Sequence, residues 1–142
     1  MVKFIILCFF LILNGCSTLK KDVVDCPTVI APKKAAEVVV KSENKLPVYI
    51  GFRGIESYCT KDDDNIEMEI SVNVRAIRKD TKIEDFVPVN ISLVSTDLNN
   101  KEYDRDDFTY SQFLLKGSKI VDRATILDIK IPNGGQVYLG LR

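Results

Sequence analysis

The sequence predicts an all-β domain, an antiparallel, immunoglobulin-like β-sandwich of about seven to eight strands, with a small closed barrel as the alternative. In residues 66–76, six apolar side chains alternate with five polar ones, which is the period-two pattern of a half-buried strand. Other apolar runs occur at fairly regular spacing, with turn residues between them. No long segment has the apolar spacing of a helix. Together these observations favour two packed sheets.

The first expected elements lie between the amino terminus and residue 53. A short edge strand is expected at residues 28–32, which contain an apolar run between two prolines. Residues 35–41 include three consecutive valines and are interpreted as a strand, although their Ala-Ala-Glu start also suits a helical turn. A turn at residues 42–45 leads into a strand at residues 46–53, where apolar side chains again occupy alternate positions.

The later elements follow the acidic turn at residues 61–65. After the strand at residues 66–76, four more strands are expected, at residues 86–96, 108–115, 120–131 and 137–141. The last two are separated by Pro132-Asn133-Gly134-Gly135. Asn and Gly tolerate the positive φ angles of hairpin turns, so the sequence predicts a hairpin there.

The first residues have the composition of an export signal. Ten consecutive apolar residues, 4–13, follow a short start that carries one cation, Lys3. A signal-peptide core needs about 7–15 apolar residues and a membrane-spanning helix about 20. Residues 1–15 are therefore expected to be a signal peptide.

Residues Leu13-Asn14-Gly15-Cys16 resemble the lipobox of bacterial lipoproteins. The resemblance implies attachment of diacylglycerol to Cys16, cleavage just before it, and acylation of the new amino terminus with a fatty acid such as palmitate. The alternative is an ordinary secretory signal that is cut elsewhere. If the chain is cleaved just before Cys16, residues 16–25 form the lipidated amino terminus and a tether, and residues 26–142 form the domain.

The location follows from the same resemblance. Lipoproteins of Gram-negative bacteria with Asp after the acylated Cys tend to stay in the inner membrane, and this chain has Ser17 there. The analogy favours the outer membrane, facing the periplasm, with the inner membrane as the alternative. Three acyl chains would make the attachment permanent.

Cys26 and Cys59 are the two cysteines that remain when Cys8 leaves with the signal and Cys16 is lipidated. In an exported chain, such a pair predicts a disulfide, whose loop of about 34 residues would stabilise the fold by roughly 3–4 kcal/mol. Two free thiols are the alternative. Neither cysteine has the Cys-x-x-Cys spacing of a redox site, and the chain has no His to complete a zinc site.

Short motifs along the mature chain resemble a group of small, functionally uncharacterised lipoproteins of alphaproteobacteria. After the lipobox come Cys26-Pro27-Thr28-Val29, then Cys59 and the alternating strand, and finally Ile129-Lys130-Ile131-Pro132 and Gln136-Val137-Tyr138-Leu139-Gly140. The resemblance implies a location in the cell envelope and an all-β domain. The group has no known activity that the resemblance could imply for this chain.

The composition argues against several classes of function. The formal net charge is zero, whereas nucleic-acid binding needs a clustered basic excess. The absence of His removes the usual proton carrier of enzymes. The acidic runs do not have the ligand spacing of an EF-hand calcium loop. We therefore expect no catalytic residues, no metal ligands and no cofactor.

The expected function is that of a lipid-anchored, non-enzymatic binding or structural module with an envelope protein as its partner. Tyr serves protein interfaces well, and two tyrosines flank an acidic run that is expected to be a loop. The candidate partner loop therefore comprises Tyr103, Asp104, Asp106, Asp107 and Tyr110. The alternatives are a periplasmic carrier of a small ligand and a hydrolase that uses paired carboxylates.

Overall fold

The structure, a computed structural model, describes residues 21–142 and builds them almost entirely from β-strands. Within these residues there are eight strands and one short helix. The strands are β1 (Val29–Ile30), β2 (Glu37–Lys41), β3 (Pro47–Asp62), β4 (Asn65–Arg78), β5 (Asp85–Thr96), β6 (Glu102–Leu114), β7 (Ile120–Pro132) and β8 (Gln136–Leu141), and the helix is α1 (Lys33–Ala36). The expected signal peptide (residues 1–15) and the expected lipidation site Cys16 lie outside the described residues.

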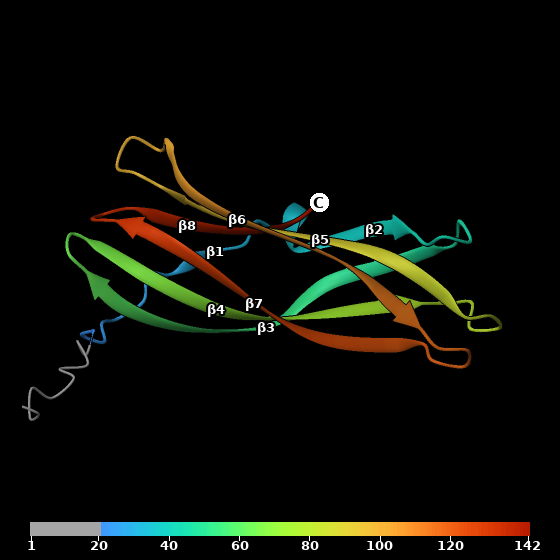
Figure 1. The fold of residues 1–142 in the computed structure, drawn as a ribbon. Helices are drawn as coiled ribbons and strands as arrows, with labels where there is room; N and C mark the ends of the chain where they lie inside the picture. The colour runs from blue at the N-terminus through green and yellow to red at the C-terminus, as the bar shows by residue number, and fades with distance from the viewer. Residues whose placement is uncertain (1–20) are drawn as a thin grey trace, which may run out of the picture.

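The strands form two sheets of four, which pack face to face (Figure 1). Sheet A has the order β2-β3-β4-β7, and sheet B has the order β1-β8-β5-β6. All neighbouring strands are antiparallel except β1 and β8, which are parallel. The predicted antiparallel β-sandwich of seven to eight strands is confirmed.

The core lies between the sheets and is formed by alternate residues of the long strands. On β4 and β5, the inward-facing side chains are at most 3% exposed, namely Met68, Ile70, Val72, Val74, Ala76, Val87, Val89, Ile91 and Leu93. Burying each large apolar side chain stabilises the fold by about 1.5–3 kcal/mol. The period-two pattern of residues 66–76 therefore corresponds to a strand with one face in the core, as predicted.

Two strands are longer than the sequence indicated. β3 continues to Asp62, beyond the expected end at residue 53, and β6 begins at Glu102, before the expected start at residue 108. Residues 53–58 are all exposed, and residues 102–107 are exposed or half-buried. Both segments lie at a sheet edge, because β2 does not extend along residues 53–58 and β6 is an edge strand. They bury little surface, so they have no apolar alternation to reveal them.

Two expectations about local structure are corrected. Residues 35–41 are divided, because α1 ends at Ala36 and β2 starts at Glu37. The predicted hairpin between the last two strands is wrong, because β7 pairs with β4 in sheet A while β8 pairs with β5 in sheet B. The turn at residues 133–135 thus joins the two layers, and Gly134 adopts the expected positive φ of 73° there.

The turns gather at the two ends of the sandwich (Figure 1). We call the end with the turns at residues 63–64, 97–101 and 133–135 the entry end, because the first described residues lie against it. The other end, with the turns at residues 42–46, 79–84 and 115–119, is the distal end.

The described residues before β1 are fixed to the entry end. The Val24 N–H donates to the Cys59 carbonyl at 3.1 Å, and the Lys61 N–H donates to the Asp22 carbonyl at 2.8 Å. Cys26 and Cys59 form the predicted disulfide, with their Cα atoms 5.3 Å apart. The described part of the expected tether is therefore held against β3.

Candidate functional site

The five residues of the expected partner loop lie on a strand. Tyr103, Asp104, Asp106, Asp107 and Tyr110 all belong to β6, which is paired with β5 along nearly its whole length. The prediction of a loop is wrong because charged residues can occupy an edge strand that is solvated along most of its length. A rigid strand, and not an adaptable loop, presents these side chains.

The strand distributes these residues over different surfaces, since successive side chains of a strand point to opposite faces. Tyr110 is 9% exposed and lies beneath the guanidinium of Arg123, which is 4.2 Å from the ring centre. Tyr103 lies at a β-bulge and is 48% exposed. The two tyrosines therefore do not form one recognition surface.

Asp104 and Asp106 bind the backbone of the neighbouring edge strand. The Lys130 N–H donates to Asp104 Oδ2 at 2.8 Å, and the Asp128 N–H donates to Asp106 Oδ2 at 2.9 Å. Both donors belong to β7, the edge strand of sheet A. The two carboxylates thus occupy N–H groups that would otherwise be open to another strand.

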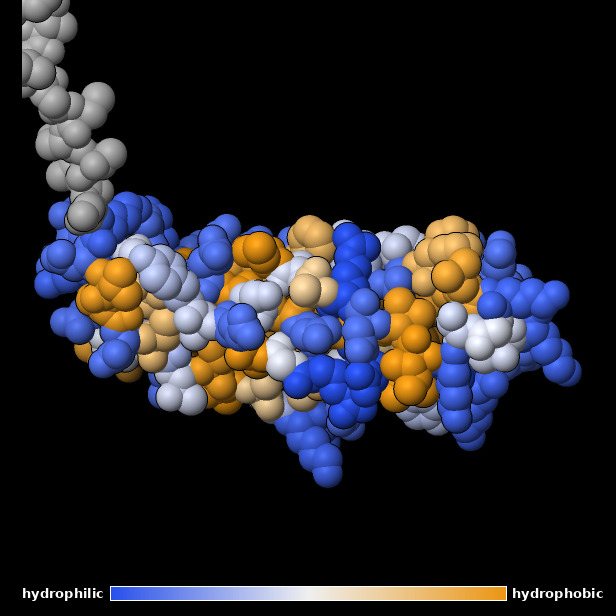
Figure 2. All heavy atoms as spheres, turned by 90° about the horizontal axis from the view of Figure 1, so that it is seen from below, coloured by the Kyte–Doolittle hydropathy of each residue, from blue (hydrophilic) through white to orange (hydrophobic). Residues whose placement is uncertain are grey.

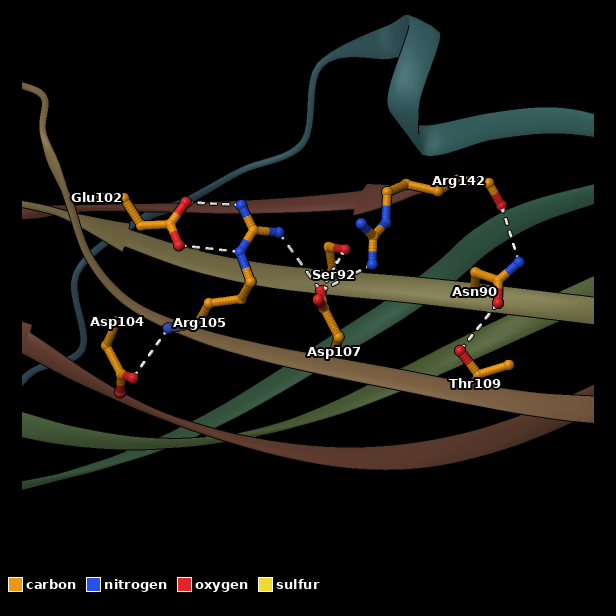
Figure 3. Close-up of polar contacts among 8 residues, drawn as sticks. All are labelled: Asn90, Ser92, Glu102, Asp104, Arg105, Asp107, Thr109 and Arg142. Atoms are coloured by element: carbon orange, nitrogen blue, oxygen red, sulfur yellow. Dashed lines mark hydrogen bonds and ion pairs between the residues drawn. The ribbon is translucent and has the colours of Figure 1, made fainter.

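Asp107 lies in a network of charged and polar groups formed by β5, β6 and Arg142 (Figure 3). It accepts hydrogen bonds from the Ser92 hydroxyl at 2.6 Å and from Arg105 at 3.5 Å, and Arg142 lies 3.0 Å from the same carboxylate. Arg105 also donates to both carboxylate oxygens of Glu102, at 3.0 and 2.7 Å. Two arginines and two carboxylates therefore largely neutralise each other.

The hydrogen bonds and ion pairs of this network stabilise the ionised forms of Asp107 and Glu102. The Ser92 hydroxyl, with Arg142 and Arg105, holds the pKa of Asp107 below its usual range, although partial desolvation opposes the effect. The hydrogen bonds from Arg105 likewise lower the pKa of Glu102. A carboxyl that transfers protons near neutral pH needs a pKa close to the working pH. These carboxylates are suited to holding ion pairs.

The outer face of sheet A has two shallow pockets, and Figure 2 shows its apolar side chains in separate patches divided by charged ones. One pocket, of about 410 Å³, is open over Gly51 and lies beside an apolar row formed by Val39, Tyr49, Ile77 and Ile120, which are aligned across the four strands. The other, of about 550 Å³, is lined mainly by charged residues, including Lys21, Glu67, Glu69, Asp128 and Lys130. Lys21 forms an ion pair with Glu67 there.

Some members of the β6 network could not be identified from the sequence. Arg105 and Asp107 are two residues apart, so a strand assignment for residues 102–107 would have placed them on one face. Ser92 and Arg142 are brought to Asp107 only by the pairing of β5 with β6 and with β8. No sequence pattern indicates these two contacts.

The comparisons with known proteins identify no function for this chain. Comparisons with protein-family models, with curated proteins and with solved structures find no significant match to this chain. Among residues 21–142, no group of three or more His, Cys, Asp or Glu is arranged to hold a metal ion. No helix in the same part of the chain has the length and hydrophobicity needed to cross a membrane.

Proposed function

We propose that the protein is a lipid-anchored protein of the bacterial envelope whose β-sandwich is a non-enzymatic docking module for another envelope protein. The anchor is Cys16, which follows the apolar run of residues 4–13 and completes the lipobox-like motif. Acylation there would hold the domain at the outer membrane, on the periplasmic side.

The observation that carries the proposal is the attachment of the first described residues to the entry end. Hydrogen bonds hold Asp22 and Val24 to β3, and the disulfide fixes Cys26 to Cys59. Only residues 17–21 separate Cys16 from Asp22, which is a span of at most about 20 Å. An anchor at Cys16 would therefore hold the entry end close to the membrane.

The free edge of β3 is the surface best suited to a protein partner. β2 stops pairing with β3 at Gly51, and the next backbone contact on that side is the bridge between Val23 and Thr60. Residues 53–58 between these points are exposed, and Ile55 and Tyr58 are 39% and 54% exposed. An open strand edge of this kind can pair with an extended segment of another protein.

Two other functions have less support from the geometry. A carrier needs room between its sheets, and here the space is filled by side chains such as Ile70, Ile91 and Leu93, which are 0% exposed. A glycosidase needs two free carboxyls that face a substrate. The carboxylates of β6 are engaged with backbone N–H groups and arginines.

Labelling of cells with a palmitate analogue tests the anchor. The unchanged protein and the Cys8→Ser variant should both incorporate the label, because Cys8 lies within the expected signal peptide. The Cys16→Ser variant should incorporate none. Label that persists in Cys16→Ser would refute the lipid anchor.

Site-specific photocrosslinking in intact cells tests the docking edge. A photoreactive residue at Ser57, on the free edge of β3, should give one discrete adduct with another envelope protein. The same residue at Ser111, which is exposed on β6, serves as the matched control and should give none. Equal adducts from both positions, or no adduct from Ser57, would count against docking through β3.

A further inference from the structure

We infer that the distal end is a docking surface for the anionic headgroups of a bilayer that faces the anchoring membrane. The surface consists of six lysines and two exposed apolar side chains, Ile83 and Leu115, in and beside the three distal turns. The orientation rests on the proposed anchor at the opposite end, whereas the lipid contact rests on the residues of the distal end alone.

The charge of the distal end is the first support. Its three turns and their borders carry six exposed lysines, Lys41, Lys45, Lys79, Lys82, Lys116 and Lys119. The exposed acids in the same turns are Glu43, Asp80 and Glu84. None of the six lysines takes part in an ion pair with any residue from 21 to 142. The entry end instead carries the acidic turn around Asp63 and Asp64, so the domain is polarised.

The apolar pair in the same turns is the second support. Ile83 is 44% exposed and Leu115 is 54% exposed, and they come from different turns. The buried guanidinium of Arg78 donates to the carbonyls of both residues. The Gly117 N–H also donates to the Thr81 carbonyl at 2.8 Å, which joins the same two turns. The backbones of Ile83 and Leu115 are therefore held close to each other, which gives the two exposed side chains a fixed base.

An apolar row extends this surface onto sheet A. Val39, Tyr49 and Ile120, which lie on the strands next to the distal turns, are 59%, 48% and 50% exposed. A soluble polyanion would neutralise the lysines but leave these side chains in water. A bilayer of anionic lipid satisfies both groups, since headgroups attract lysines and the interface accepts apolar side chains. This combination favours lipid over an acidic protein or polymer.

A tryptophan probe tests contact with lipid, since the chain has no Trp of its own. Full-length protein with Leu115→Trp is reconstituted in phosphatidylcholine vesicles and mixed with acceptor vesicles of equimolar phosphatidylglycerol and phosphatidylcholine with brominated acyl chains. The fluorescence should shift to the blue and be quenched. Acceptors of phosphatidylcholine alone should have no effect. Leu98→Trp is the matched probe at the entry end, where Leu98 is 76% exposed, and acceptors should leave it unchanged.

Charge variants test the role of the lysines. Each lysine near an anionic surface should strengthen binding about fivefold, so Lys82→Gln with Lys116→Gln should weaken acceptor binding about 25-fold. Lys61→Gln with Lys101→Gln makes the same charge change at the entry end and should leave binding unchanged. Equal weakening by both pairs, or quenching by phosphatidylcholine acceptors, would overturn the inference. So would lysine-dependent binding of heparin without any lipid-induced shift in the fluorescence of the Leu115→Trp variant.

The same samples separate this inference from the proposed anchor. Flotation of the protein with the reconstituted vesicles reports the anchor, and quenching by acceptors reports the distal end. Protein that does not float but is still quenched would refute the anchor and support the lipid contact. Protein that floats but is not quenched would support the anchor and refute the lipid contact.

Discussion

Arg78 shows how one side chain organises the distal end. It is 3% exposed, and its guanidinium donates to the carbonyls of Ser118, Ile83 and Leu114 at 3.0, 2.8 and 3.3 Å, and also to that of Leu115. A buried charge is costly unless its donors are satisfied. Here the carbonyl dipoles of two turns satisfy them, and in return the turns acquire a fixed position.

Replacing Arg78 by Lys should destabilise the domain by about 3 kcal/mol, because an ammonium group cannot reach carbonyls on both turns and buried carbonyls lose their donors. Urea denaturation would measure the free energy of unfolding. Arg123→Lys is the control, since Lys retains much of the cation–π contact with Tyr110 and should cost less than about 1 kcal/mol. Equal costs for the two variants would mean that Arg78 has no special role.

Glycines show a second effect at the scale of one residue. A Cβ atom on Gly135 would collide with the Thr96 carbonyl oxygen and lie 2.9 Å from the Pro132 carbonyl oxygen, whereas one on Gly54 would meet nothing within 4 Å. Gly135→Ala should therefore cost about 3 kcal/mol, because the turn between the sheets must move. Gly54→Ala should leave stability unchanged or raise it by up to about 1 kcal/mol. Thermal unfolding of both variants would measure the difference in their stabilities. Equal stabilities would show that the turn at Gly135 relaxes without cost.

At the scale of elements, the two lateral sides of the sandwich differ. On one side, β6 and β7 are the edge strands of different sheets, and the carboxylates of Asp104 and Asp106 join them. On the other side, residues 53–58 of β3 lie beside β4 along one edge but have no partner strand along the opposite edge within the described residues. Side chains that occupy a strand edge limit pairing with other chains. The acidic residues of β6 therefore cover the edge of β7, whereas residues 53–58 of β3 keep an open edge for the proposed partner.

Removing both carboxylates should open the edge of β7. In the double variant Asp104→Ala, Asp106→Ala, hydrogen exchange of the Asp128 and Lys130 N–H groups should become faster, and size-exclusion chromatography should show association through the exposed edge. The double variant Asp64→Ala, Glu84→Ala removes the same charge from exposed acids that accept no hydrogen bond from residues 21–142, so it should behave like the unchanged protein. Unchanged exchange in the first variant would show that water replaces the carboxylates at no cost.

The sequence predicted the elements that have one buried face and missed those that have none. β4 was found because Ile70, Val72 and Val74 alternate with polar residues, and burial requires that alternation. Residues 53–58 of β3 and the start of β6 are largely solvated, so they satisfy no packing constraint that a pattern could reveal. The disulfide was predictable from the cysteine count and the expected export of the chain. The contacts of Asp107 with Ser92 and Arg142 depend on strand order, which local periodicity does not contain.

At the scale of the whole molecule, the pKa values of four carboxyls, Asp85, Glu102, Asp107 and Asp122, lie below their usual range. Arg75 lowers the pKa of Asp122, in addition to the effects on Glu102 and Asp107. Burial opposes ionisation of Asp85, but the nearby Ser42 hydroxyl and the N–H groups of Phe86 and Asn44 outweigh it and lower its pKa. The chain has no His, the side chain that ordinarily titrates between pH 5 and 8.

These shifts predict how stability depends on pH. A carboxyl whose pKa is lower in the folded state binds fewer protons than in the unfolded chain, so its contribution is present above the unfolded pKa of about 4 and is lost as the pH falls through the folded value. The free energy of unfolding should therefore be flat from about pH 5.5 to 8 and fall below about pH 4. Urea denaturation across this range would measure this free energy.

Two variants test the cause of the acid slope. Asp107→Asn should make the slope shallower, because one of the shifted carboxyls is removed. Asp64→Asn, at an exposed acid without an ion pair to any described residue, should leave the slope unchanged. A slope between pH 6 and 7 would contradict the prediction, since it would require a group that titrates near neutrality, which the side chains of this sequence do not ordinarily supply.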